Sequence, residues 1–132
     1  GGTSGALWGA GLRAAARALS DDEVPADALV AACREAIESV TAYGNARLGD
    51  KTLIDAFDPF MQTLSGDLEG GLPAGAAWAN AAITAAAAAD ATAALTPRLG
   101  RARVLASRSL GHRDPGAVSF AVVVAAATDH FP

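Results

Sequence analysis

The sequence predicts an all-α protein, an antiparallel up-and-down bundle of helices. Hydrophobic residues make up 52% of the chain and aromatic residues only 5%, because much of the apolar content is alanine, the best helix former. Apolar residues recur at helical spacing in five segments joined by short connections, and only the last segment is ambiguous between helix and strand. The 132 residues are enough for one domain with its own core.

Two helices are predicted in the N-terminal third of the chain. The first spans residues 3–19, where Thr3 or Ser4 can cap a helix that follows two glycines. The second spans residues 25–43, and Gly44 stands where a C-terminal glycine belongs. One face of this second helix is apolar and consists of Leu29, Cys33, Ile37 and Val40.

Two further helices are predicted in the middle of the chain. Asp50 caps the third, whose apolar stripe runs from Leu53 to Leu68, and Pro59 is expected to kink it. A turn follows at residues 66–71. The fourth helix, residues 73–95, is almost wholly alanine, with Trp78 and Ile83 as its large apolar residues. Small side chains let neighbouring backbones come close, so this helix is expected to be a central packing element.

The last predicted helix spans residues 117–131 and is preceded by a strong start signal. Its valine-rich stretch fits a buried strand on periodicity alone. Asp114 as the N-cap, Pro115 at the first helical position and the alanines that follow favour a helix.

Half of the positive charge lies in one segment of an acidic chain, which has a formal net charge of −4. That balance argues against general nucleic-acid binding. Five of the ten basic residues lie between residues 96 and 113: Arg98, Arg101, Arg103, Arg108 and Arg113. Guanidinium groups bind phosphate through paired hydrogen bonds, although a solvated surface loop is the simpler interpretation. The helix starts at Asp114 and at Thr3 favour an anion, because such ends bind anions.

Several classes of protein are disfavoured by the same composition. Cys33 is the only cysteine, so no internal disulfide forms, and its apolar surroundings indicate a small core residue. No apolar run is long enough to span a membrane. No signal peptide is recognised, and a cytoplasmic protein without membrane partners is expected.

Four separated motifs occur in the order typical of one family. They are Gly1-Gly2-Thr3-Ser4-Gly5, Gly49-Asp50-Lys51-Thr52 followed by Asp55, Gly100-Arg101-Ala102, and Ser109-Leu110-Gly111-His112-Arg113-Asp114-Pro115-Gly116-Ala117. With this pattern the chain resembles the nucleotide-binding L subunit, or C-terminal L domain, of dihydroxyacetone (glycerone) kinases, the DhaL or DAK2 family.

The resemblance implies a helical barrel of about eight helices that holds ADP or ATP and two Mg²⁺ ions at one end. Thr3 and Ser4 would lie at the phosphates, Gly44 and Leu53 would line the nucleotide pocket, and Arg101 would approach the phosphates as the catalytic cation. Asp114, Pro115 and Gly116 would close the site. A separate K subunit or domain would carry dihydroxyacetone, and the donor is either ATP or a phosphocarrier subunit.

The chain departs from the family pattern at its start. In the family an Asp-rich motif that supplies the magnesium carboxylates precedes the Gly-Gly-Thr-Ser segment, whereas no Asp or Glu occurs here before Asp21. Residues 1–132 are therefore expected to be an N-terminally truncated L domain, with about five of eight helices and no metal ligands. Alone, this chain is expected to lack kinase activity, to bind nucleotide weakly and to expose an apolar flank.

Two other functions fit the same features. One is a non-catalytic helical-bundle module that binds an apolar ligand, and the other is the nucleotide domain of a fatty-acid kinase. Single residues also have simpler interpretations. His112 is expected to stabilise its turn, Asp50 to cap a helix, and Lys51 to be solvated, instead of acting in catalysis.

Overall fold

The computed structural model describes residues 9–11, 13, 25–99 and 106–130, and within them every regular element is helical. The prediction of an all-α protein is therefore confirmed. The chain divides into two compact units, residues 1–45 and 46–132, which are described separately. The predicted helix at residues 3–19 falls mostly outside the described residues, although residues 9–11 and 13 are helical.

The first unit contains helix α2, Ala26–Gly44. It begins one residue later than predicted, with Pro25 as the N-cap. Its end corrects the prediction for Gly44, because Gly44 is the last helical residue and Asn45 takes the left-handed conformation, at φ 48°. Asparagine tolerates this conformation better than most residues, so it substitutes for the expected glycine.

The buried face of α2 is shifted from the predicted one. Leu29 and Val40 are buried as expected, but Cys33 and Ile37 are only half-buried. The alanines Ala32 and Ala36 are more deeply buried instead. Burial raises the pKa of the Cys33 thiol to about 11, which keeps it protonated and supports the inert, structural role expected for it.

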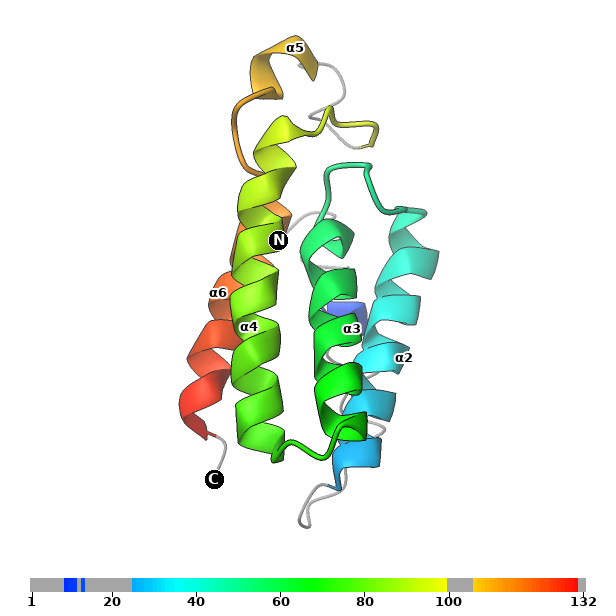
Figure 1. Cartoon of the computed structure of the whole chain (residues 1–132). Helices are drawn as coiled ribbons and strands as arrows, with labels where there is room; N and C mark the ends of the chain where they lie inside the picture. Colours follow the sequence, from blue (N-terminus) through cyan, green and yellow to red (C-terminus); the bar gives the residue numbers. More distant parts are fainter. Residues whose placement is uncertain (1–8, 12, 14–24, 100–105, 131–132) are drawn as a thin grey trace. The chain divides into compact units, whose positions relative to one another are not determined.

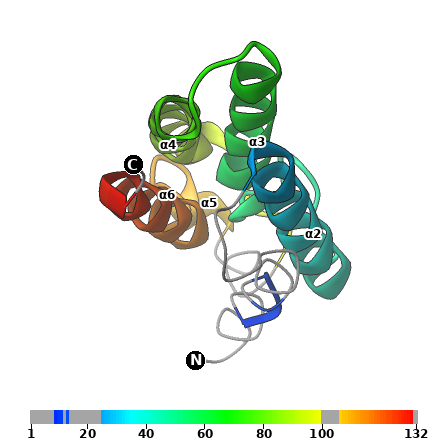
Figure 2. The ribbon, with the colours of Figure 1, turned by 90° about the horizontal axis from the view of Figure 1, so that it is seen from below.

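The second unit is an up-and-down arrangement of three long helices (Figures 1 and 2). They are α3 (Ile54–Glu69), α4 (Ala74–Ala91) and α6 (Pro115–Ala127). Short 3-10 turns, Thr92–Ala94 and Thr128–His130, extend α4 and α6. Helix α4 packs against both α3 and α6 and runs antiparallel to each, which confirms its predicted central place.

Two features of this unit differ from the predictions. Helix α3 continues through Gly66 to Glu69, so the predicted turn at residues 66–71 is confined to residues 70–73. Pro59 lies inside α3 as the sequence predicts, and the kink expected there stays a prediction. A short helix, α5 (Ala106–Ser109), forms in the segment that was expected to be entirely loop.

Aromatic rings join the three long helices in the core. The rings of Phe57 on α3 and Phe120 on α6 stack with centroids 4.4 Å apart. Phe60 meets Trp78 of α4 edge-on at 4.9 Å, and the Trp78 Nε1–H donates to the Val124 carbonyl at 2.8 Å. Such ring pairs each contribute about 0.5–1.5 kcal/mol beyond their buried area. The cluster therefore fixes α3, α4 and α6 in one register.

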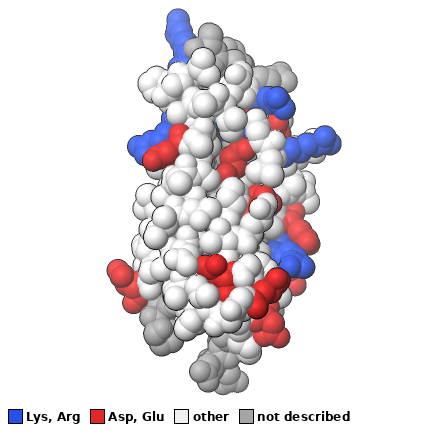
Figure 3. All heavy atoms as spheres, in the orientation of Figure 1, with Lys and Arg blue, Asp and Glu red and all other residues white. Residues whose placement is uncertain are grey.

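Alanine explains why α4 can occupy the middle. Its buried positions recur every four residues at Ala77, Ala81, Ala85 and Ala89, each at most 2% exposed. With only a methyl group at each position, the neighbouring helices approach its backbone closely. Ile83 lies off this stripe and is 71% exposed, and the surface along α4 is largely uncharged (Figure 3). No helix in the described part of the chain combines the length and apolar character needed to cross a bilayer.

Candidate functional site

The starts of α3 and α6 meet near the C-terminal end of α4 (Figure 1). A Cβ placed on Gly116 would lie 3.3 Å from the Leu53 Cβ and 3.4 Å from the Leu53 backbone nitrogen. The absence of a Cβ at Gly116 therefore lets the first turn of α6 approach the residue before α3 without crowding. Leu53 and Gly116, two residues that the family resemblance assigns to a nucleotide site, are therefore neighbours.

Asp114 begins α6 as the sequence predicts. Its Oδ2 accepts a hydrogen bond from the Ala117 N–H at 2.7 Å, and Pro115 occupies the first helical position. The Asp114 N–H in turn donates to the Thr92 Oγ1 at 2.8 Å, and this hydroxyl donates to the Ala89 carbonyl at 2.6 Å. A hydroxyl that is 1% exposed thus ties the start of α6 to the end of α4.

The sequence predicts an anion-binding site at the start of α6, but the Asp114 cap already occupies its backbone donors. The Asp114 carboxylate accepts from the backbone N–H groups of Gly116 and Ala117, which are the donors that an external anion would need. Burial raises the pKa of Asp114 above 3.8, and the nearby Asp55 carboxylate adds to the rise. The two backbone N–H groups and Lys51 act in the opposite direction.

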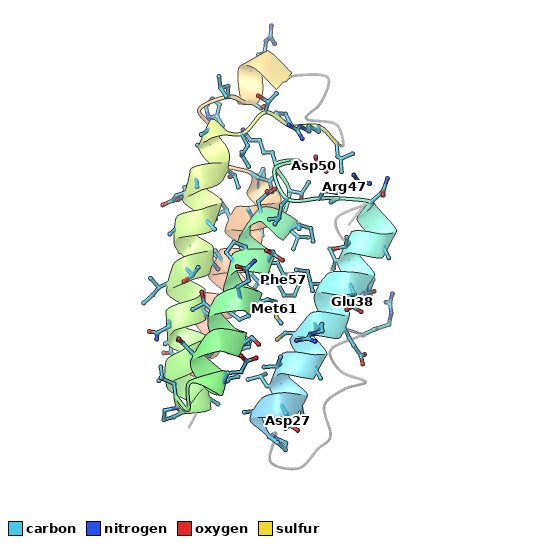
Figure 4. The ribbon with its side chains drawn as sticks, turned by 45° about the vertical axis from the view of Figure 1, so that its right-hand side comes forward. Asp27, Glu38, Arg47, Asp50, Phe57 and Met61 are labelled. Carbon is cyan, nitrogen blue, oxygen red and sulfur yellow. The ribbon has the colours of Figure 1, made fainter. Side chains whose placement is uncertain are left out.

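The turn before α3 is organised by two aspartates that hold backbone N–H groups. The Asp50 Oδ2 accepts from the Arg47 N–H at 2.8 Å, and Figure 4 shows both residues in the turn that leads into α3. Asp55 accepts from the N–H groups of Gly49 at 2.5 Å and Thr52 at 2.7 Å. The prediction that Asp50 caps the helix is wrong, because Leu53 is the N-cap residue and Asp50 closes the preceding turn.

Lys51 is buried, which corrects the prediction of a solvated lysine. It is only 6% exposed, and its φ of 61° is in the left-handed region. Its Nζ donates to the carbonyls of Leu95, at 3.0 Å, and Ser109, at 2.6 Å. Leu95 lies just before the arginine-rich segment of residues 96–113, and Ser109 lies in the C-terminal part of that segment, so a single ammonium group joins the two.

The described arginines of the arginine-rich segment form only weak ion pairs. The Arg98 N–H donates to the Asp50 carbonyl at 3.1 Å, and its guanidinium lies 3.9 Å from the Asp50 carboxylate. Arg113 pairs with Asp90 at 2.8 Å, and both side chains are more than half exposed. Such exposed pairs contribute about 0–1 kcal/mol. Arg108 is exposed, so the described arginines fit a solvated surface and leave guanidinium groups accessible to a ligand.

The remaining predicted site residues are not described as part of the cluster at the starts of α3 and α6. Thr3, Ser4 and Arg101 lie outside the described residues. Gly44 ends α2 in the first unit. His112 is exposed and contributes its backbone N–H to the Ser109 carbonyl at 3.1 Å. The roles expected for these residues remain predictions, whereas Leu53, Asp114, Pro115 and Gly116 form one described cluster.

The carboxylates of this end do not fit a magnesium site. In the described part of the chain, no group of three or more His, Cys, Asp or Glu side chains is placed to hold a metal ion. Asp50, Asp55 and Asp114 each use carboxylate oxygens to hold backbone N–H groups in turns or at a helix start. Recruiting them as ligands would break these turns, so no chemical step is assigned to a metal here.

Comparison with known proteins places these features in a family. The family model for the DAK2 domain matches residues 1–129. The chain is 48% identical to the L-erythrulose kinase of Pectobacterium atrosepticum over 125 residues, which is 94% of this chain and 21% of that protein. It is 43% identical to the D-erythrulose kinase of Mycolicibacterium smegmatis over 130 residues, covering 98% of this chain and 22% of that protein.

A shorter relative is similar over the same region. The ADP-binding subunit of the PEP-dependent dihydroxyacetone kinase of Escherichia coli is 36% identical over 120 residues, 90% of this chain and 57% of that subunit. The chain thus spans about a fifth of the length of the erythrulose kinases that it matches. Because the family model covers nearly the whole sequence, the chain belongs to the DAK2 domain family.

Proposed function

We propose that this chain is the nucleotide-binding, phosphoryl-transfer domain of a kinase that acts on a short-chain ketose such as dihydroxyacetone. The observation that carries the proposal is the contact between Leu53 and Gly116 at the meeting point of α3 and α6. The motifs that contain these two residues are separated in sequence but adjacent in space. The E. coli relative named as an ADP-binding subunit supports the same role.

Phosphoryl transfer depends mainly on positioning and on neutralising charge. In the proposed site Leu53, Gly44 and the Asp114–Gly116 turn line the nucleotide, and Thr3, Ser4 and Arg101 hold phosphate oxygens. Magnesium would neutralise phosphate charge in such a reaction, but carboxylate ligands for it are not found among the described residues. The ketose would be presented by a separate K subunit or domain, and the donor is ATP or a phosphocarrier subunit acting through bound ADP.

Titration calorimetry with ADP on the full gene product tests the nucleotide site. Replacing Arg101 by Ala is expected to weaken ADP binding by about 1.5–3 kcal/mol, the usual loss for a hydrogen bond to a charged group. Arg113→Ala is the matched control, because it removes a guanidinium of the same segment whose partner is the exposed Asp90. The control is expected to bind ADP nearly as well as the wild type.

Two results would contradict this assignment. Equal dissociation constants for the Arg101→Ala variant and the wild type would return Arg101 to a solvated surface loop. Failure of the wild-type gene product to bind ADP would favour the non-catalytic helical module instead. Both outcomes are read from the same titrations.

A four-carbon ketose is a second candidate for the acceptor. The relatives at 48% and 43% identity are named erythrulose kinases, whereas the dihydroxyacetone kinase subunit is 36% identical. Coupled kinase assays of the gene product with dihydroxyacetone, L-erythrulose and D-erythrulose compare the candidates directly. The ketose with the highest kcat/KM identifies the acceptor, and inactivity with all three would reject the proposed reaction.

A further inference from the structure

The buried ammonium group of Lys51 connects three separate segments of the second unit. Its two acceptors, the carbonyls of Leu95 and Ser109, lie 44 and 58 residues further along the chain. Lys51 itself belongs to the turn that leads into α3. Lys51 is the only lysine of the sequence, and every other basic residue is an arginine.

Placing a lysine here is energetically unfavourable in two ways. An ammonium group loses its hydration when it is buried, and a non-glycine residue at φ 61° is in a sparsely populated backbone conformation. The carbonyl groups and the electrostatic attraction to Asp114 offset the first cost. An apolar side chain such as methionine would fill the same volume without either the charge or the need for partners. The lysine therefore performs a task that packing alone does not require.

That task is to hold two limbs of the chain together beside the candidate site. The first limb runs from Leu95 to Arg98, and the second runs from Ser109 through the turn that precedes α6. Other bonds fasten the same limbs at neighbouring points, since the Gly111 N–H donates to the Ala93 carbonyl at 2.9 Å and the Asp114 N–H to Thr92. Among these described hydrogen bonds, only those of the Lys51 ammonium join both limbs through a single side chain.

We propose that Lys51 is a positioning residue for nucleotide binding. By joining the two limbs it keeps the start of α6 and the backbone that carries Arg98 and Arg108 at fixed distances from Leu53. A bound nucleoside diphosphate then meets these groups already arranged, instead of ordering them at the expense of affinity. This inference rests on the proposed nucleotide-binding function and adds a residue that does not itself touch the ligand.

The test replaces Lys51 by Met, which keeps the length of the side chain and removes its charge and donors. In the full gene product, the Kd for ADP is expected to rise about tenfold or more. The matched control is Val124→Ala. Val124 is buried in α6, ten residues beyond Asp114, so this substitution lowers the stability of the fold without touching the two limbs. This control is expected to keep its Kd within about twofold of the wild type.

A second measurement needs no nucleotide. Hydrogen exchange of the Arg98, Gly111 and His112 amides, which donate to Asp50, Ala93 and Ser109, is expected to accelerate in Lys51→Met and not in the control. If Lys51→Met does not fold, Lys51→Gln replaces it, since it retains a hydrogen-bond donor, and the same two effects are expected at smaller size.

The outcomes separate this inference from the function on which it rests. Wild-type binding of ADP with an unchanged Kd in the Lys51 variant overturns the positioning role and leaves the proposed function standing. Equal losses in the Lys51 variant and the Val124 control also overturn it, because general destabilisation would then explain both. Failure of the wild type to bind ADP overturns the proposed function and the positioning role together.

Discussion

Replacing Thr92 by Val tests how the start of α6 is anchored. The two side chains have nearly the same shape, so the change removes one buried hydroxyl and leaves the packing intact. The Asp114 N–H then loses its acceptor at 2.8 Å. The Ala89 carbonyl loses the hydroxyl but keeps the backbone N–H of Thr92 as a donor. The main cost is therefore one buried, unsatisfied N–H, worth about 1–3 kcal/mol.

Urea denaturation followed by circular dichroism measures this cost as a lower midpoint at an unchanged slope. Thr84→Val is the matched control, because Thr84 lies on α4, the helix that ends at Thr92, and its hydroxyl bonds the Asn80 carbonyl and the Thr63 hydroxyl near the surface. The control is expected to change the free energy of unfolding by less than about 0.5 kcal/mol. Equal effects of the two substitutions would refute the anchoring role of Thr92.

Two further predictions concern the same helix start. Gly116→Ala is expected to destabilise the fold by about 1–3 kcal/mol, because the new Cβ would lie 2.9 Å from the Asp114 Oδ2 and 3.3 Å from Leu53. Gly66→Ala, in open space on α3, is expected to stabilise it, and the opposite order in urea denaturation would contradict the packing described. Burial raises the pKa of Asp114 in the folded state above 3.8, its ordinary value in the unfolded chain. The contribution of the Asp114 carboxyl group to the free energy of unfolding is therefore complete at a pH below the unfolded pKa and is lost as the pH rises through the folded pKa. Relative to Asp114→Asn, which retains a capping oxygen, the wild type is therefore expected to lose stability from acidic to neutral pH, and a gain in urea titrations over that range would rule this out.

Local sequence signals were sufficient for most of the helices. Alanine-rich composition and apolar spacing predicted the helices that became α2, α3, α4 and α6, because these signals act within a few residues. The Asp114–Pro115 pair located the start of α6 correctly, since a capping side chain bonds a backbone group only three residues away. The same reasoning wrongly predicted Asp50 as a helix cap. Asp50 and Asp55, five residues later, both accept hydrogen bonds from backbone N–H groups of the turn before α3.

The parts of the site that depend on distant contacts were missed. Nothing near Lys51 in the sequence shows that its ammonium meets carbonyls of Leu95 and Ser109, or that its backbone is left-handed. Thr92 was similarly hidden inside a predicted helix, although it anchors Asp114. One signal was available for Lys51, since it is the single lysine in a chain whose other cations are arginines.

The burial of that single lysine also determines how the surface of this chain responds to modification. The other nine residues of the Lys and Arg set are arginines, whose guanidinium groups stay charged at any pH that proteins encounter. Acetyl transfer and amine-directed crosslinking therefore find no accessible lysine ammonium on the folded chain, and its positive charge is insensitive to them. A protease specific for lysine likewise has one cleavage point, at Lys51, and reaches it only when the turn before α3 opens. The rate of that single cut reports directly on how often this end of the molecule comes apart.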